Sequence, residues 1–236
     1  RLRVAVLSIR PTHRHLGGER LVGLSLAWLL VGYATTLDFG VGRALTHMVA
    51  GLRAGGGQGR GAIAVAVNTA ARMSWATGGV AAGIAGVGLL VLVSLRQGPG
   101  SVPAAELLAA GLLVTGSLPL QTVSATYRGT NEAYLNFRGI SMVRVTLGVA
   151  NFGAPCLISF FTDRLHWLAL SLTVSRLAAL AAYRHLAMRI THGAPARRAG
   201  FDPGVARRLL GYGGWVTLCN LAGPAVSVAD PCIIAS

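Results

Sequence analysis

The chain has 236 residues, of which 53% are hydrophobic and only 12% are charged. A soluble domain usually carries about a quarter charged residues, so this composition excludes an ordinary soluble domain and indicates a membrane protein. The formal net charge of +14 comes entirely from arginine, because the chain contains no lysine.

Long uncharged runs predict the membrane-spanning helices. A helix needs roughly 20 apolar residues to cross the hydrocarbon core of a bilayer, and each run approaches that length. We therefore predict an all-α, polytopic integral membrane bundle with about six spans. The predicted spans cover residues 21–37, 73–95, 107–127, 139–162, 165–183 and 209–229. A soluble helical core is the alternative, but its helices would be shorter and amphipathic.

Glycine and proline positions predict close packing and kinks. Residues 61–95 form one continuous helical pattern, in which Gly79 and Gly83 have the GxxxG spacing that lets helices approach closely. Pro119 and Pro155 lie inside spans, where proline bends a helix. The stretch after the first span becomes glycine-rich at "GLRAGGGQGRG" and predicts a flexible turn.

The arginines are unevenly divided between alternate connections. Most fall in the connections over residues 38–72, 128–144 and 184–208, whereas the opposite side carries fewer. The positive-inside rule then places these three connections in the cytoplasm. Nucleic-acid binding would need a soluble basic face, which this pattern does not provide. We therefore expect no nucleic-acid partner.

Motifs for catalysis and for metal or cofactor binding are incomplete. "DFG" at residues 38–40 also occurs in kinases, but a kinase and a phosphate-binding P-loop both need a lysine. "GVGRAL" lacks the third glycine of a dinucleotide fingerprint. His13 and His15 have no neighbouring ligands, and the cysteines show no metal-ligand spacing. We expect a protein that is not an enzyme and holds no metal or cofactor.

Polar residues inside the spans are the first candidate site residues. A charge at the bilayer centre costs roughly 2.5–3.5 kcal/mol, so it normally faces a partner or a watery cavity. Arg176 would either bind an anion in a cavity or pair with a buried carboxylate or helix carbonyls. Arg144, near a cytoplasmic end, would bind an anion or snorkel to the interface. Asn151 and Asn220 would bond sugar hydroxyls or bond across helices.

Three segments carry a family resemblance. They read "LGGERLVGLSLAWLLVGYATTLDFGVGRALTHMVAGL" (16–52), "SLPLQTVSATYRGTNEAYLNFRGI" (117–140) and "LLGYGGWVTLCNLAGPAVSVAD" (209–230). They resemble parts of bacterial polysaccharide and O-antigen flippases, which belong to the multidrug/oligosaccharidyl-lipid/polysaccharide exporter superfamily. In the order given, these parts are the second-helix region, the turn after the fourth helix and the seventh helix. The matching positions are Leu16, Gly17, Glu19, Arg20, Gly23, Asp38, Gly40, Arg43, Ala44, Thr46, Gly213, Gly214, Trp215, Thr217, Asn220 and Asp230.

The resemblance implies a transporter with two related lobes around a central cavity. Such a protein moves undecaprenyl-diphosphate-linked oligosaccharide across the bacterial inner membrane by alternating access. Arg176 and Arg144 would then meet the pyrophosphate, while Asn151 and Asn220 would contact sugar hydroxyls. The implied partners are the lipid-linked oligosaccharide, membrane lipids and polysaccharide assembly proteins.

The resemblance also sets the expected domain organisation. Residues 16–236 would form the N-terminal transmembrane lobe, and residues 1–15 would be an incomplete or degraded remnant of the first helix. Because residues 1–15 are short and charged and the second half is missing, we expect a chain truncated at both ends. The alternatives are a multidrug exporter of the same superfamily, which would favour carboxylates for cation and proton coupling, and a non-transporting remnant. A membrane-bound polysaccharide polymerase would need a larger outer loop.

Asp38 and Arg43 flank the two glycines of "DFGVGR". On an unbroken helix, residues five positions apart point about 140° apart, so the two side chains would not form an ion pair along one face. They would serve either as a helix cap and a positive anchor or as a cytoplasmic gate that closes in one state only. We group Asn131 and Glu132 with them as gating or structural polar residues.

Overall fold

The computed structural model of the protein describes residues 40–55, 59–95, 103–159, 165–191 and 200–217. These residues form helices joined by turns, with no strand among them. The helices are α3 (Val41–Ala54), α4 (Gly59–Leu95), α5 (Ala104–Gly116), α6 (Leu118–Ala133), α7 (Phe137–Ser159) and α8 (Leu165–Ile190), followed by a helix over residues 203–217. The all-α prediction is therefore confirmed for the described part of the chain.

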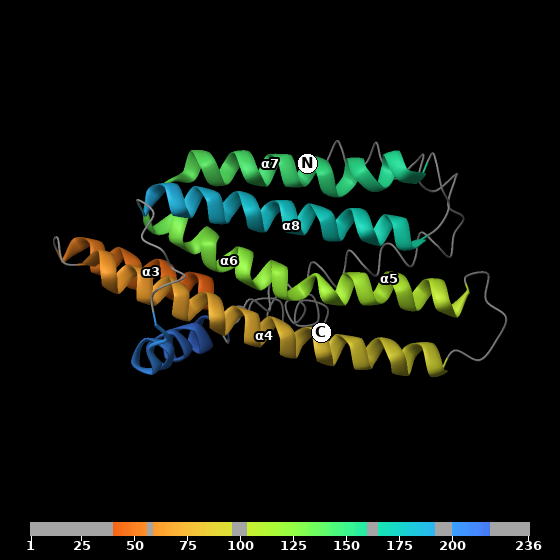
Figure 1. Ribbon diagram of the computed structural model, residues 1–236, viewed down its shortest axis with the longest axis horizontal. Coiled ribbons are helices and arrows are strands. Elements are labelled where there is room, and N and C mark those ends of the chain that lie inside the picture. The colour runs from red at the N-terminus through yellow and green to blue at the C-terminus, as the bar shows by residue number, and fades with distance from the viewer. Residues whose placement is uncertain (1–39, 56–58, 96–102, 160–164, 192–199, 218–236) are drawn as a thin grey trace, which may run out of the picture.

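The long helices lie side by side in one elongated bundle (Figure 1). α7 packs on α8, α8 packs on α5 and α6, and these two pack on α4. α3 contacts both α4 and α6, and the helix over 203–217 packs beside α3 through Ala206 and Leu209. α6 contacts α3, α4, α7 and α8 and is therefore the central helix of the bundle.

α3 and α4 run in opposite directions, α5 and α6 run together against α4, and α7 and α8 again alternate (Figure 1). The helix termini therefore gather at the two ends of the bundle. α3, α6 and α8 end on one side, where α4 and α7 begin, and α4 and α7 end on the other (Figure 1). The connections predicted to share the cytoplasmic side are thus on one side of the structure. We call this side the arginine-rich end, after its exposed arginines Arg43, Arg53, Arg138, Arg144, Arg184, Arg189, Arg207 and Arg208.

α4 is built of two contrasting parts. With 37 residues it is about 55 Å long, which exceeds the roughly 30 Å thickness of a hydrocarbon core. Its first part packs into a buried cluster with α3 and the helix over 203–217, through Ile63, Ala66, Val67 and Ala70. Its second part is apolar and open, with exposed side chains at Val80, Ile84, Val87, Leu90 and Val91.

Two helical stretches are long and apolar enough to cross a membrane. They are Gly61–Val91 and Ala104–Ala133, which overlap the predicted spans 73–95 and 107–127. The helices predicted over 139–162 and 165–183 are present as α7 and α8, but they are not among these two stretches. A bundle of six spans therefore remains a prediction. Residues 21–37 and most of 209–229 lie outside the described residues.

Two local expectations can be compared with the structure, and one of them changes. The stretch after the first span is not only a turn, because residues 41–54 form α3, whose apolar positions Val41, Leu45 and Val49 recur every four residues and are buried. The predicted bend at Pro119 is present, since α5 ends and α6 begins at Ser117. Proline lacks the backbone N–H that would continue the α5 ladder into α6.

The packed glycine of α4 is a neighbour of the predicted GxxxG pair. A Cβ atom at Gly79 or Gly83 would meet nothing within 4 Å among the described residues. A Cβ atom at Gly78 would instead overlap Thr122 and Pro119 of α6. Gly78 therefore lets α4 and α6 approach closely, and among the described residues it is this glycine, one position before the predicted pair, that carries the contact.

Adjacent glycines offer a matched test of this packing. We expect Gly78→Ala to destabilise the bundle by about 1–3 kcal/mol, because the added methyl forces α4 away from α6. Gly79→Ala should be neutral or slightly stabilising, because alanine is the better helix former and the site is open. Unfolding in mixed micelles would measure both, and equal effects would contradict the contact.

Candidate functional site

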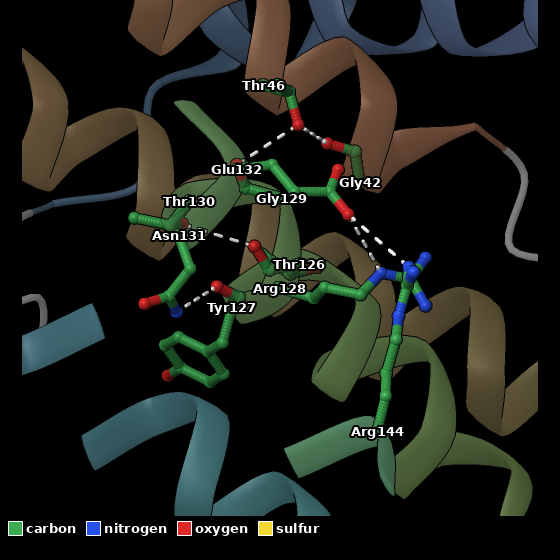
Figure 2. Close-up of polar contacts among 10 residues, drawn as sticks. All are labelled: Gly42, Thr46, Thr126, Tyr127, Arg128, Gly129, Thr130, Asn131, Glu132 and Arg144. Atoms are coloured by element: carbon green, nitrogen blue, oxygen red, sulfur yellow. Dashed lines mark hydrogen bonds and ion pairs between the residues drawn. The ribbon is translucent and has the colours of Figure 1, made fainter. Parts of the chain in front are cut away.

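The three segments that carry the family resemblance meet at the arginine-rich end. α3 belongs to the first segment, α6 to the second and the helix over 203–217 to the third. At the contact of the first two, the Thr46 hydroxyl donates to the carbonyls of Gly42 and Gly129, each at 3.0 Å (Figure 2). A Cβ atom at Gly129 would overlap the Gly42 carbonyl. Glycine at position 129 thus permits the crossing of α3 and α6.

Glycine also permits the contact of the first and third segments. Gly40 has φ 63°, in the left-handed region that favours glycine, and a Cβ atom there would overlap the carbonyl oxygen of Gly213. About two turns further along the chain from Gly40, the His47 ring of α3 stacks on the Tyr212 ring with centroids 5.1 Å apart. Sequence order alone could not show that "DFGVGR" and "LLGYGGW" touch.

Arg53 ties the end of α3 to the end of α6. Its Nη1 atom donates to the Ala133 carbonyl at 2.7 Å, and its guanidinium carbon lies 4.3 Å from the centre of the Tyr134 ring. The carbonyls of the last helical turn have no partner within their own helix, so an arginine there both bonds them and complements the negative end of the dipole. The sequence reasoning did not select Arg53.

Asn131 is a structural residue of the α6–α8 contact. Its side chain is fully buried, and its Nδ2 atom donates to the carbonyls of Tyr127 (2.8 Å) and Tyr183 (3.2 Å). Its Oδ1 atom accepts from Asn136 Nδ2 at 3.2 Å, in the turn that leads into α7. Of the two roles expected for Asn131, the structure supplies the partners of the structural one.

Glu132 and Arg144 form a charged cluster with Arg128. The carboxylate oxygen Oε1 of Glu132 lies 3.5 Å from Arg128 Nε and 3.7 Å from Arg144 Nη2 (Figure 2). The side chains remain partly exposed, at 33% for Arg128, 29% for Glu132 and 49% for Arg144. Tyr183 of α8 also interacts with Arg144. The i, i+4 spacing of Arg128 and Glu132 is a sequence signal for this pair that the prediction did not include.

Arg176 lies in the middle of α8, and its side chain is partly buried. Its Nε atom is buried and has no hydrogen-bond partner among the described residues. Leu172, one turn earlier on the same face, packs against Ala110 and Val114 of α5. An uncompensated guanidinium in such surroundings would attract an anion more strongly than one in water.

Asn151 bonds the residue that precedes Arg176 in α8, and this interhelical bond was one of its two expected roles. Its Oδ1 atom accepts from the Ser175 hydroxyl at 3.0 Å, which joins α7 to α8. Arg144 is not at this level, because its contact Tyr183 lies about 10 Å further along α8 than Arg176. The structure therefore separates the two arginines that the sequence placed in one site.

Of the remaining predicted site residues, one is described by the structure and two are not. Arg43 is exposed on α3, whereas Asp38 and Asn220 lie outside the described residues. No group of three side chains suited to a metal ion occurs among the residues that the structure describes.

No protein family model, no curated protein and no solved structure matches this chain.

Arg53 provides a test of the contact between the resemblance segments. We expect Arg53→Met to destabilise the protein by about 1–2 kcal/mol, because a charged hydrogen bond and a cation–π contact are lost while the apolar stem is kept. Arg72→Met, at an exposed position of α4, should change stability by about 0.5 kcal/mol or less. Unfolding in mixed micelles compares them, and equal losses would remove Arg53 from the contact.

Proposed function

We propose that the protein is a multi-pass component of a bacterial inner membrane. The support is the open apolar surface of α4, where only 11% of the most apolar window of Gly61–Val91 is buried. In water such a surface would be a large aggregation-prone patch, whereas in a bilayer it faces lipid. The arginine-rich end would face the cytoplasm by the positive-inside rule.

Within that membrane, the protein acts as the N-terminal lobe of a polysaccharide flippase. It moves undecaprenyl-diphosphate-linked oligosaccharide from the cytoplasmic to the periplasmic leaflet by alternating access. The observation that carries this proposal is the meeting of the three resemblance segments at Gly42–Gly129 and Gly40–Gly213. Motifs that are distant in sequence but adjacent in space are expected when they form one contact region between helices.

Arg176 is the proposed contact for the diphosphate. Its buried Nε has no hydrogen-bond partner among the described residues, and it sits in a helix that packs on both α6 and α7. Ser175, the residue before it in α8, and Asn151, which bonds Ser175 from α7, offer polar groups for a sugar hydroxyl. Glu132 is held between two arginines, which favours a flippase over a multidrug exporter that would use a carboxylate to bind a cation.

A genetic experiment tests the transport. Deletion of the reading frame that contains this chain should make lipid-linked oligosaccharide accumulate on the cytoplasmic side and reduce surface polysaccharide. In the restored strain, Arg176→Gln should lower surface polysaccharide about tenfold or more, because a charged contact to the anion is lost. Arg184→Gln, an exposed position on the same helix, should restore export fully.

The outcomes separate the parts of the proposal. Normal export with Arg176→Gln at normal protein level would remove Arg176 from the mechanism. Unchanged polysaccharide and no accumulated intermediate after deletion would contradict the flippase function itself and leave a non-transporting remnant.

A further inference from the structure

One face of α4 changes from buried to open along the length of the helix. Ala66 and Met73 belong to the buried cluster that α3 and the helix over 203–217 form on α4. A helix turns by about 100° per residue, so positions 80, 84, 87 and 91 all point within about 40° of Met73. The side chains at these positions are apolar and between 49% and 71% exposed. We call them the open stripe: Val80, Ile84, Val87 and Val91.

α3 stops covering this face near Met73. α3 and α4 are consecutive helices that run in opposite directions, so Val41, the first residue of α3, lies near the level of Met73, the last residue of α4 in the cluster. The described chain therefore enters the bundle at Gly40, beside the start of the open stripe. Gly40 has φ 63°, and a left-handed glycine commonly ends a helix, so a preceding helix can follow α4 instead of the axis of α3.

The predicted span 21–37 has the length and composition that the open stripe requires. Its 17 residues are all uncharged, and only two residues separate it from Gly40. As a helix it would be about 26 Å long, and the face of α4 from Met73 to Val91 extends about 27 Å. Residues 218–229, which follow the helix over 203–217, would extend only about 18 Å and contain a proline.

We propose that residues 21–37 of the same chain dock as a helix on the open stripe and run antiparallel to α4 toward Gly40. The inference rests on the membrane location proposed above, but not on transport. The opposite open side of α4, which carries Leu90, is left to lipid.

The chemistry of the stripe and the connection to α3 both favour this occupant. The four side chains of the open stripe are β-branched, and a β-branched residue has few rotamers in a helix, so little side-chain entropy is lost when another helix packs on it. A short tether gives the segment an effective concentration of about the millimolar range. A second copy of the chain would have to compete with that concentration.

Disulfide formation in the full chain, in its native membrane, tests the docking. The native cysteines Cys156, Cys219 and Cys232 are replaced by alanine. Ile84→Cys or Val91→Cys is then combined with one cysteine at each position of 21–37 in turn, and the membranes are oxidised with copper phenanthroline. A protease site placed in residues 55–58 separates the two cysteines, so a chain cross-linked within itself stays whole on a gel after cleavage.

The expected cross-links have a period and a direction. They should occur within one chain and recur every three or four positions of 21–37, because one helix face meets the stripe. The partners of Val91 should precede those of Ile84 by about seven residues, because Val91 lies about 10 Å further from Met73 and the segment runs toward Gly40.

Leu90 provides the matched control. It is exposed and precedes Val91 in the chain, but it points about 100° away from the open stripe. Leu90→Cys should therefore lose the cross-links that Val91→Cys forms. Thermal unfolding of each reduced variant checks its fold, and the two stripe positions give independent scans where a single variant fails to fold.

Three patterns would overturn the inference. Cross-links between two chains would place a second copy on the open stripe. Cross-links in a parallel scan of 218–229, with none in 21–37, would assign the stripe to that segment. Equal cross-linking from Leu90 and Val91, or none from any stripe position, would leave the stripe to lipid. Release of the chain from membranes by alkaline carbonate would instead contradict the membrane location, which is a separate failure.

Discussion

The structure depends on how the polar side chains of α6 are bonded inside the bundle. α6 is the central helix, and Thr122, Ser124, Thr126, Thr130 and Asn131 are all buried in it. A buried hydroxyl or amide without a partner is costly, and more so where no water is available. Some of these groups bond the carbonyls of their own helix, as Ser124 does with Leu120 and Thr130 with Thr126.

The other polar groups of α6 bond neighbouring helices and thereby set their positions. The Thr122 hydroxyl donates to the Ser74 carbonyl of α4 at 2.8 Å, and the hydroxyls of Ser74 and Thr126 lie 2.7 Å apart. Asn131 bonds α8, and Thr46 of α3 bonds the end of α6. Apolar side chains alone would let helices slide in lipid, so these directional bonds are what fix the register. The charged cluster at Glu132 is placed by the same helix.

Much of the fold follows from local sequence patterns, but the contacts between helices do not. The continuous apolar pattern over 61–95 predicts α4, and Pro119 predicts the break between α5 and α6, because both effects act within a few residues. The apolar period of α3 was hidden by the flanking glycines. Which glycine is packed, Gly78 or Gly79, depends on the rotation of one helix against another, which no pattern within α4 specifies.

The candidate site shows the same division. Arg176 stands out in the sequence because it interrupts an apolar run, and the structure leaves its Nε buried without a partner among the described residues. Arg144 also stands out, but its nearness to Glu132 arises from the turn between α6 and α7. Arg53 lies in a stretch predicted as a connection, so its bond to Ala133 needed the three-dimensional crossing of α3 and α6.

The coupling between Ser74 and Thr126 tests the role of α6 most directly. A double-mutant cycle with Ser74→Ala and Thr126→Val, measured by unfolding in lipid–detergent micelles, should give a coupling of about 0.6–1.7 kcal/mol. The same cycle between Ser74 and Thr146, whose exposed hydroxyl donates to the Met142 carbonyl of its own helix α7, should give no coupling. Zero coupling between Ser74 and Thr126 would contradict the account, because the bond that positions α4 on α6 would then contribute nothing.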